Sequence, residues 1–262
     1  MQQNPAIRHR HGALPQRRAA GRARGCGILA PVGALPASSS SLRMTLIALN
    51  KPFGTMSQFS AHPSRPTLAD CVALPGVYPA GRLDADSEGL LLLTDDGALQ
   101  ARIADPHHKL AKTYLVQVEN MPGADALARL RAGVDLGDFR TRPAQARLIE
   151  EPGFLWPRQP PVRFRAAIPT QWLEMEIREG KNRQVRRMTA AVGFPTLRLV
   201  RVKIGALDLR ALGLAPGQWC EVSAADLGLP AAAAPRPHPS PRADTARAPA
   251  GRQTRSPGRP RR

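Results

Sequence analysis

The most constraining feature of this chain is a charged loop that leads directly into an apolar strand. Residues 81–89 read Gly-Arg-Leu-Asp-Ala-Asp-Ser-Glu-Gly, and Leu90-Leu91-Leu92-Leu93-Thr94 follow without a break. An apolar run of this length between turn signals is typical of a buried strand. We therefore expect Asp84 on a tight loop fixed to a core strand, an arrangement that holds a catalytic carboxylate in place.

A second informative segment is the basic stretch 179–188, Glu-Gly-Lys-Asn-Arg-Gln-Val-Arg-Arg-Met. Its glycine predicts a turn, and a helix is expected from there to about Val192, with Gly193 as its C-terminal stop. Cations in the first turns oppose the helix dipole, so a bound anion or a carboxylate partner explains them better than a solvated basic helix. The candidate binding residues here are Lys181, Asn182, Arg183, Arg186 and Arg187.

A third segment places an aromatic residue beside two cations. Tyr114 begins an alternating strand and follows Lys109 and Lys112. An aromatic ring beside phosphate-binding cations is a common arrangement for recognition of single-stranded nucleic acid. A tyrosine in a strand is also a common core residue, and that alternative stays open at this point.

The remaining pattern predicts an α+β fold. Residues 152–170 contain five prolines and are expected to form a long ordered loop or a strained hairpin. Alternating strands with a few short helices favour a mixed or antiparallel sheet. The expected strands are 45–50, 90–94, 114–118, 146–149, 172–177 and 197–205, and the expected helices are 67–74, 97–104, 123–132 and 183–192.

Charge separates the chain into three parts. The net charge is +18; residues 1–43 and 230–262 contribute +7 each, and residues 44–229 only +4. The Pro/Ala/Arg-rich tail has almost nothing to bury, so we expect it to be disordered. Residues 1–43 are Arg-rich and acid-free, and we expect a disordered basic leader or a misassigned start before Met44. A transit peptide is the alternative for 1–43. The tail would attract polyanions without specificity.

Several classes of protein fit the sequence poorly. No segment has the roughly 18 apolar residues that cross a bilayer. The cysteines, Cys26, Cys71 and Cys220, form no metal-binding spacing, and their sparse use fits a reducing cytoplasm. The adjacent His107 and His108 cannot share one face of a strand, so no metal site is expected there.

Taken in order, these segments resemble the motifs of the RNA pseudouridine synthases, over about residues 45–223. Residues 49–52, Leu-Asn-Lys-Pro, and 197–205, Leu-Arg-Leu-Val-Arg-Val-Lys-Ile-Gly, also resemble that family's framework. The resemblance is to the branch with the small-subunit enzyme and the B, E and F large-subunit enzymes, and the 151–158 and 168–173 segments resemble the E type. Residues 1–43 are too short for the S4 RNA-binding module that the branch often carries.

The resemblance implies a fold, an activity and a set of site residues. The fold is a mixed, largely antiparallel central sheet with flanking short helices and an active-site cleft. The activity is isomerisation of a flipped-out uridine in 23S ribosomal RNA by a monomeric bacterial cytoplasmic enzyme, without a cofactor or metal. Asp84 matches the catalytic aspartate, Tyr114 the tyrosine that stacks on the target base, and Arg186 the arginine that pairs with the aspartate.

The resemblance also gives roles to residues around the flipped nucleotide. Arg82 matches a residue near that nucleotide, Leu199 an apolar residue under the ring, and Arg201 is expected to contact RNA, as are Lys112 and the 181–187 cations. Three alternatives remain: a non-catalytic RNA-binding or ribosome-assembly protein with this fold, an enzyme of the branch acting on another rRNA or tRNA uridine, and, least consistent with the basic surroundings, a glycosidase using Asp84 and Asp86.

Overall fold

The computed structural model describes residues 44–104, 110–163, 165 and 167–229. The predictions for 1–43, 230–262, Lys109 and the His107-His108 pair lie outside these residues. The helices are α1 (Gly97–Ala104), α2 (Ala124–Ala132), α3 (Gln184–Ala191) and α4 (Leu209–Leu212), with 3₁₀ turns at Leu68–Asp70 and Ala225–Leu227. The strands are β1 (Leu46–Lys51), β2 (Tyr78–Pro79), β3 (Glu88–Thr94), β4 (Lys112–Glu119), β5 (Gln145–Ile149), β6 (Thr170–Ile177), β7 (Thr196–Ile204), β8 (Leu207–Asp208) and β9 (Trp219–Glu221).

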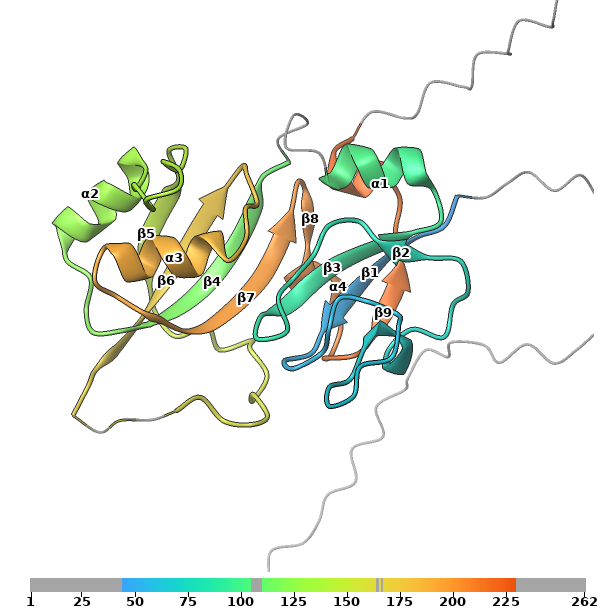
Figure 1. The fold of residues 1–262 in the computed structure, drawn as a ribbon, viewed down its shortest axis with the longest axis horizontal. Coiled ribbons are helices and arrows are strands. Elements are labelled where there is room, and N and C mark those ends of the chain that lie inside the picture. Colours follow the sequence, from blue (N-terminus) through green and yellow to red (C-terminus); the bar gives the residue numbers. More distant parts are fainter. Residues whose placement is uncertain (1–43, 105–109, 164, 166, 230–262) are drawn as a thin grey trace, which may run out of the picture. The chain divides into compact units, whose positions relative to one another are not determined.

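The strands form one sheet, which confirms the expected α+β class. Its order is β5-β6-β4-β7-β3-β1-β9, with β2 paired to β3 and β8 to β7 (Figure 1). The β3–β7 pairing is parallel through Glu88↔Val200 and Gly89↔Arg201, and every other pairing among the named strands is antiparallel. The parallel contact brings the start of β3, and therefore the charged loop before it, beside the middle of β7.

The leucine run of β3 is buried on both faces of the sheet, as its unbroken apolar sequence predicts. Leu91 and Leu93 belong to the core that contains the apolar side of α3, whereas Leu90 and Leu92 pack with Leu99 of α1. Side chains alternate along a strand, so a strand covered on both faces must be apolar at every position. This double burial fixes the position of the loop at residues 81–87.

The structure differs from the sequence expectation in its short elements. Residues 67–74 were expected to form a helix, but only the 3₁₀ turn Leu68–Asp70 forms, and Pro75 and Gly76 follow soon after it. The strands β2, β8 and β9 and the helix α4 were not predicted, because elements of two to four residues carry almost no periodic signal. Residues 152–161 and 167–169 are loop rather than hairpin. No helix in the described part of the chain could cross a membrane.

Candidate functional site

The Asp84 loop is held through its backbone at successive positions. Ser57 Oγ donates to Leu83 O at 2.6 Å and accepts from Leu83 N at 3.2 Å. Gly54 N donates to Ala85 O at 2.7 Å, and Ser87 N closes the turn onto Asp84 O at 3.0 Å. With β3 buried behind it, this loop is a rigid support for the Asp84 carboxylate.

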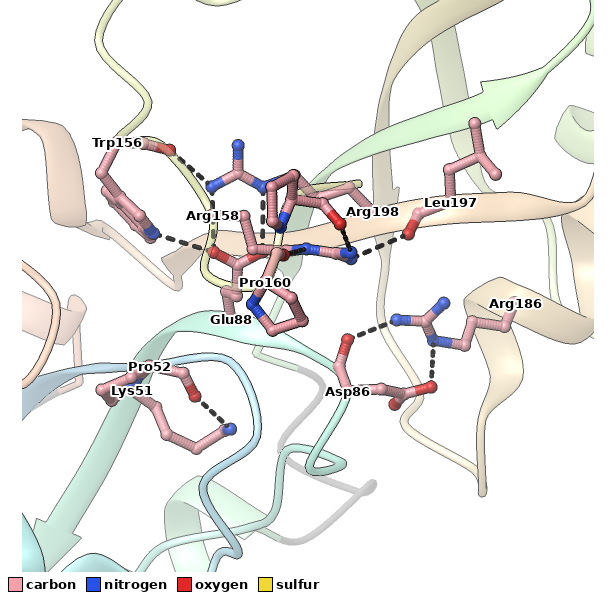
Figure 2. Close-up of polar contacts among 11 residues, drawn as sticks. Lys51, Pro52, Asp86, Glu88, Trp156, Arg158, Pro160, Arg186, Leu197 and Arg198 are labelled. Carbon is pink, nitrogen blue, oxygen red and sulfur yellow. Dashed lines mark hydrogen bonds and ion pairs between the residues drawn. The ribbon is translucent and has the colours of Figure 1, made fainter. Parts of the chain in front are cut away.

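Two arginines of the 179–188 segment meet the loop, but their partners differ from those expected. Arg183 donates to both carboxylate oxygens of Asp86, at 3.1 and 2.7 Å, and its Nη1 lies 3.6 Å from Asp84 Oδ2. Arg186 donates to the backbone oxygen of Asp86 at 2.6 Å, and its Nε lies 3.5 Å from the Asp86 carboxylate (Figure 2). The expected ion pair between Arg186 and Asp84 is therefore replaced by one with Asp86, because the turn at 84–87 brings Asp86 nearest to α3.

Asp86 is thus the carboxylate that balances the charge of this helix start. Partial burial opposes its ionisation, but the hydrogen bond from Arg183 and the charge of Arg186 outweigh burial and lower the pKa of Asp86. The Asp84 side chain is partly exposed (34 %), and its one ion-pair contact among the described residues is the longer one to Arg183. Of the two carboxylates, Asp84 is the one left available to a bound molecule.

The start of α3 has an unusual backbone that aims its cations. Arg183 is the N-cap residue and adopts a left-handed conformation, with φ of 48°. The buried Glu179 carboxylate accepts from Gln184 Nε2 at 2.5 Å and from Arg142 N at 2.8 Å, which ties this turn to the neighbouring loop. A non-glycine residue in this region is uncommon and is often found at functional sites. The left-handed conformation of Arg183 directs its side chain toward the Asp84 loop.

A cleft of about 690 Å³ lies between the Asp84 loop, the start of α3 and the central strands. Nine of the predicted site residues line it, so residues from four separate segments of the chain come together here. Arg186 and Arg187 do not line the cleft. The nine are Arg82, Asp84, Lys112, Tyr114, Lys181, Asn182, Arg183, Leu199 and Arg201.

Tyr114, Leu199 and Arg201 come from the paired strands β4 and β7. Tyr114 is the register partner of Arg201, and both are buried. Arg201 donates through Nε to Leu90 O at 2.8 Å and, more weakly, through Nη1 to Arg82 O at 3.5 Å. Its Nη2 is buried without a partner among the described residues. This guanidinium thus contacts the backbone on both sides of the Asp84 loop.

Lys112 adds a titratable cation to the cleft. Burial lowers its pKa to about 8, and the nearby charge of Arg201 acts in the same direction. Its Nζ donates to Leu110 O at 3.1 Å, so the amine has a hydrogen-bond partner within the chain. The charge is therefore complete near pH 6 and is lost as the pH rises through about 8.

Arg187 has a different environment from the other cations of its segment. It pairs with the exposed Asp138, donates to Leu136 O at 2.9 Å and lies 5.2 Å from the centre of the Phe139 ring. Sequence reasoning missed Arg142, which lines the cleft from the 133–144 loop, and Ser57, because neither residue stands in a recognisable motif. Among the described residues, no cluster of three or more His, Cys, Asp or Glu side chains could hold a metal ion.

Comparison with protein families gives one match over residues 45–191, to the family described as RNA pseudouridylate synthase. A solved structure described as a crystal structure of pseudouridylate synthase matches with a TM-score of 0.58 and 29 % identity, over 71 % of this chain and 73 % of that one. The family match over residues 45–191 includes the Asp84 loop, Tyr114 and the whole of α3.

Two similar relatives carry a more specific name. A protein of Xanthomonas axonopodis pv. citri (strain 306) named "Ribosomal large subunit pseudouridine synthase E" is 61 % identical over 173 residues, 65 % of this chain and 90 % of its own length. A protein of Vibrio vulnificus (strain CMCP6) with the same name is 55 % identical over 186 residues, 71 % of this chain and 78 % of its own length.

Proposed function

The chain belongs to the RNA pseudouridylate synthase family, and from this we propose that it converts one specific uridine of large-subunit (23S) ribosomal RNA into pseudouridine. The identity to relatives named for the large subunit supports the choice of RNA. The observation that carries the proposal is the cleft itself, where the available carboxylate of Asp84 faces a space lined by Tyr114 and several cations. A non-catalytic RNA-binding role would not require this carboxylate.

The reaction is an isomerisation that needs no oxidant or reductant. The C1′–N1 bond of uridine breaks, the base turns, and a C1′–C5 bond forms. The hydrogen on C5 leaves as a proton and N1 gains one, so the composition of the RNA is unchanged. A carboxylate nucleophile supports such a reaction by forming a covalent intermediate that divides the bond exchange into two steps.

We assign the roles in the cleft as follows. Asp84 is the nucleophile, held by the backbone contacts of its loop. Tyr114 stacks on the uracil, with Leu199 on the neighbouring strand beside it. The target base must leave its helix or loop to reach these groups, since a carboxylate that lines a cleft cannot contact a stacked base. Arg82, which is exposed in the Asp84 loop, then lies close to the position in the RNA that the flipped base has left.

Arg186 supports the nucleophile through the loop, by its contacts with Asp86, whereas Arg183 pairs with Asp86 and also lies 3.6 Å from the Asp84 carboxylate. The two guanidinium groups balance the charge of the Asp86 carboxylate, and Arg186 also holds the Asp86 backbone oxygen. The Asp84 carboxylate then stays open to the substrate, with only the 3.6 Å contact to Arg183 among the described residues. Lys112, Lys181, Asn182 and Arg201 are the other groups of the cleft that we assign to RNA, through phosphate, ribose or base oxygens.

Lys112 gives RNA binding a specific pH dependence. Its cation is lost as the pH rises through about 8, so RNA affinity should fall between pH 7 and 9. The expected loss is about tenfold, the contribution of one charge-assisted hydrogen bond. The measurement is the dissociation constant of a 23S fragment at each pH. Lys112→Gln should bind weakly and independently of pH, and Lys112→Arg should bind tightly throughout; a parent affinity that does not change with pH would contradict the role.

We also propose that residues 44–229 form the catalytic domain and that the two arginine-rich ends only add non-specific affinity. The matched family region and all assigned residues lie within these limits. A chain of residues 44–229 should modify the same uridine, bind more weakly at low salt and differ little at high salt, because non-specific phosphate contacts are salt-dependent. Modification of a different uridine would show that the ends select the target.

The proposal places the protein in the bacterial cytoplasm, acting as a monomer on ribosomal RNA or its precursor. The test is a map of pseudouridines at single-nucleotide resolution in ribosomal RNA from a strain that lacks the gene. One large-subunit uridine should remain unmodified, and the purified chain should restore it. Loss of a site in small-subunit RNA or in tRNA instead would support the alternative that the chain is an enzyme of the same branch with another target.

A further inference from the structure

We propose that Glu88, Arg198 and Trp156 form a buried clamp that positions the Asp84 loop from the opposite face of the sheet. This inference rests on the proposed function, since it adds positioning residues to the same site. None of the three lines the cleft. Glu88 is the first residue of β3 and follows the Asp84–Ser87 turn directly, so its position sets where the loop leaves the sheet.

The Glu88 carboxylate is fully enclosed and receives three hydrogen bonds. Its side chain is 1 % exposed, and that of Arg198 is 8 % exposed. Arg198 donates through Nε and Nη2 to the two carboxylate oxygens, both at 2.9 Å. The Trp156 indole N–H donates to Glu88 Oε1 at 2.8 Å, and Trp156 O accepts from Arg198 Nη2 at 2.9 Å (Figure 2). The three residues thus form a closed set of contacts.

The 152–161 loop, which carries Trp156, makes a second attachment through Arg158. The Arg158 guanidinium lies 4.4 Å from the centre of the Phe53 ring. It donates to Leu197 O at 3.4 Å and to Pro160 O and Pro161 O, both at 2.8 Å. Phe53 precedes Gly54, whose N–H holds Ala85 O in the Asp84 loop. The 152–161 loop is therefore joined to β3, to β7 and to the segment that supports the catalytic loop.

The clamp and the cleft lie on opposite faces of the sheet. Glu88 and Val200 are register partners, and Arg198, Val200 and Val202 alternate with Leu199 and Arg201 of the cleft. Trp156 packs against Val200 and Val202, in a cluster separate from the one that contains Leu199. The clamp therefore acts on Asp84 through the backbone that joins Glu88 to the Asp84–Ser87 turn, and not by contact with RNA in the cleft.

The buried Glu88–Arg198 ion pair at the start of β3 is better explained by a role beyond stability. Replacement of a buried pair by apolar side chains is often neutral or stabilising, whereas removal of one partner alone is strongly destabilising. A bidentate arginine with an added indole donor fixes the direction of a carboxylate in a way that apolar packing does not. Replacement of both partners by apolar side chains therefore distinguishes the two roles. If the pair only stabilises the fold, the double replacement should restore both stability and the position of the Asp84 loop. If the pair positions the loop, the double replacement should restore stability alone.

The test compares Arg198→Met with the double variant Glu88→Met/Arg198→Met, and uses Arg147→Met/Glu174→Met as control. The control removes a more exposed pair of β5 and β6, in which Arg147 Nε and Nη2 both donate to Glu174 Oε1, at 3.0 and 2.8 Å, and which does not touch the Asp84 loop. Trp156→Phe keeps an aromatic side chain but removes the indole donor together with part of the ring system. Each full-length variant is measured for its urea midpoint, for hydrogen exchange of the peptide spanning 81–90, and for kcat and KM on 23S RNA.

We expect Arg198→Met to lower the urea midpoint and the double variant to recover most of that loss, the remainder being the cost of the Trp156 indole N–H without its acceptor. In the double variant, exchange of the 81–90 peptide should still be faster than in the parent, and kcat should be lower by about 10²-fold with KM unchanged, the cost of a misplaced catalytic group. Trp156→Phe should give smaller changes in the same direction, and the control none. If the double variant recovers stability together with parental exchange in 81–90, the clamp is structural only and the proposal is wrong, whether or not the parent modifies 23S RNA. An inactive parent would instead count against the proposed function.

Discussion

Replacement of Asp84 by asparagine should abolish pseudouridine formation while the protein stays folded and still binds RNA. The amide occupies the same volume but is not a nucleophile, so the expected loss in kcat is about 10⁴-fold or more. Folding should change little, because the Asp84 carboxylate is 34 % exposed and its shortest ion-pair distance is 3.6 Å, to Arg183. The measurements are single-turnover rates at saturating enzyme and the dissociation constant of the same RNA.

Asp86→Asn is the matched control, because it makes the same chemical change two residues away. It removes the charge that Arg183 and Arg186 neutralise, so it should reduce stability and lower activity without abolishing it. Turnover by Asp84→Asn at a hundredth of the parent rate, or complete loss of activity in Asp86→Asn alone, would show that the wrong carboxylate has been assigned.

Replacement of Arg186 by alanine should have the second largest effect on catalysis. It removes the hydrogen bond to Asp86 O and the charge near the Asp86 carboxylate. Because Asp86 is 36 % exposed, the expected loss in folding free energy is about 1–2 kcal/mol, below the cost of breaking a fully buried pair. The Asp84 loop should then no longer be held in place against α3, which should lower kcat by about 10²-fold.

Arg187→Ala provides the comparison on the same helix. Arg187 contacts the exposed Asp138 and does not line the cleft, so its replacement should cost less stability and leave kcat near the parent value. Any change should appear in KM for RNA. Urea denaturation and steady-state kinetics of the two variants decide the matter: an equal loss of kcat in both would mean that α3 acts as a whole and that Arg186 has no special role.

The sequence predicted the parts of the site that stand in one continuous segment. The Asp84 loop and its buried strand followed from the unbroken leucine run, and the start of α3 followed from its glycine and its clustered cations. The nine predicted residues that line the cleft belong to such segments. Local patterns of this kind can be recognised in the sequence because burial and helix-end electrostatics act on residues that are neighbours in the chain.

Pairings between distant segments were not available from the sequence. Two carboxylates separated by one residue, Asp84 and Asp86, compete for Arg186, and only the path of the 84–87 turn decides which of them is nearer. The Glu88–Arg198 pair joins residues 110 apart, and Trp156 reaches it from a proline-rich loop without periodicity. The two-residue strand β8 pairs with the end of β7, so it depends on a neighbouring strand rather than on a pattern of its own.

The most direct test of the account follows the hydrogen on C5 of the target uridine. Ribosomal RNA is prepared from a strain lacking the gene, with uridine tritiated at C5, and each subunit's RNA is incubated with the purified chain. The account predicts release of one tritium per large-subunit RNA, none from small-subunit RNA, and none with Asp84→Asn. Release from small-subunit RNA alone, or equal release by Asp84→Asn, would contradict it.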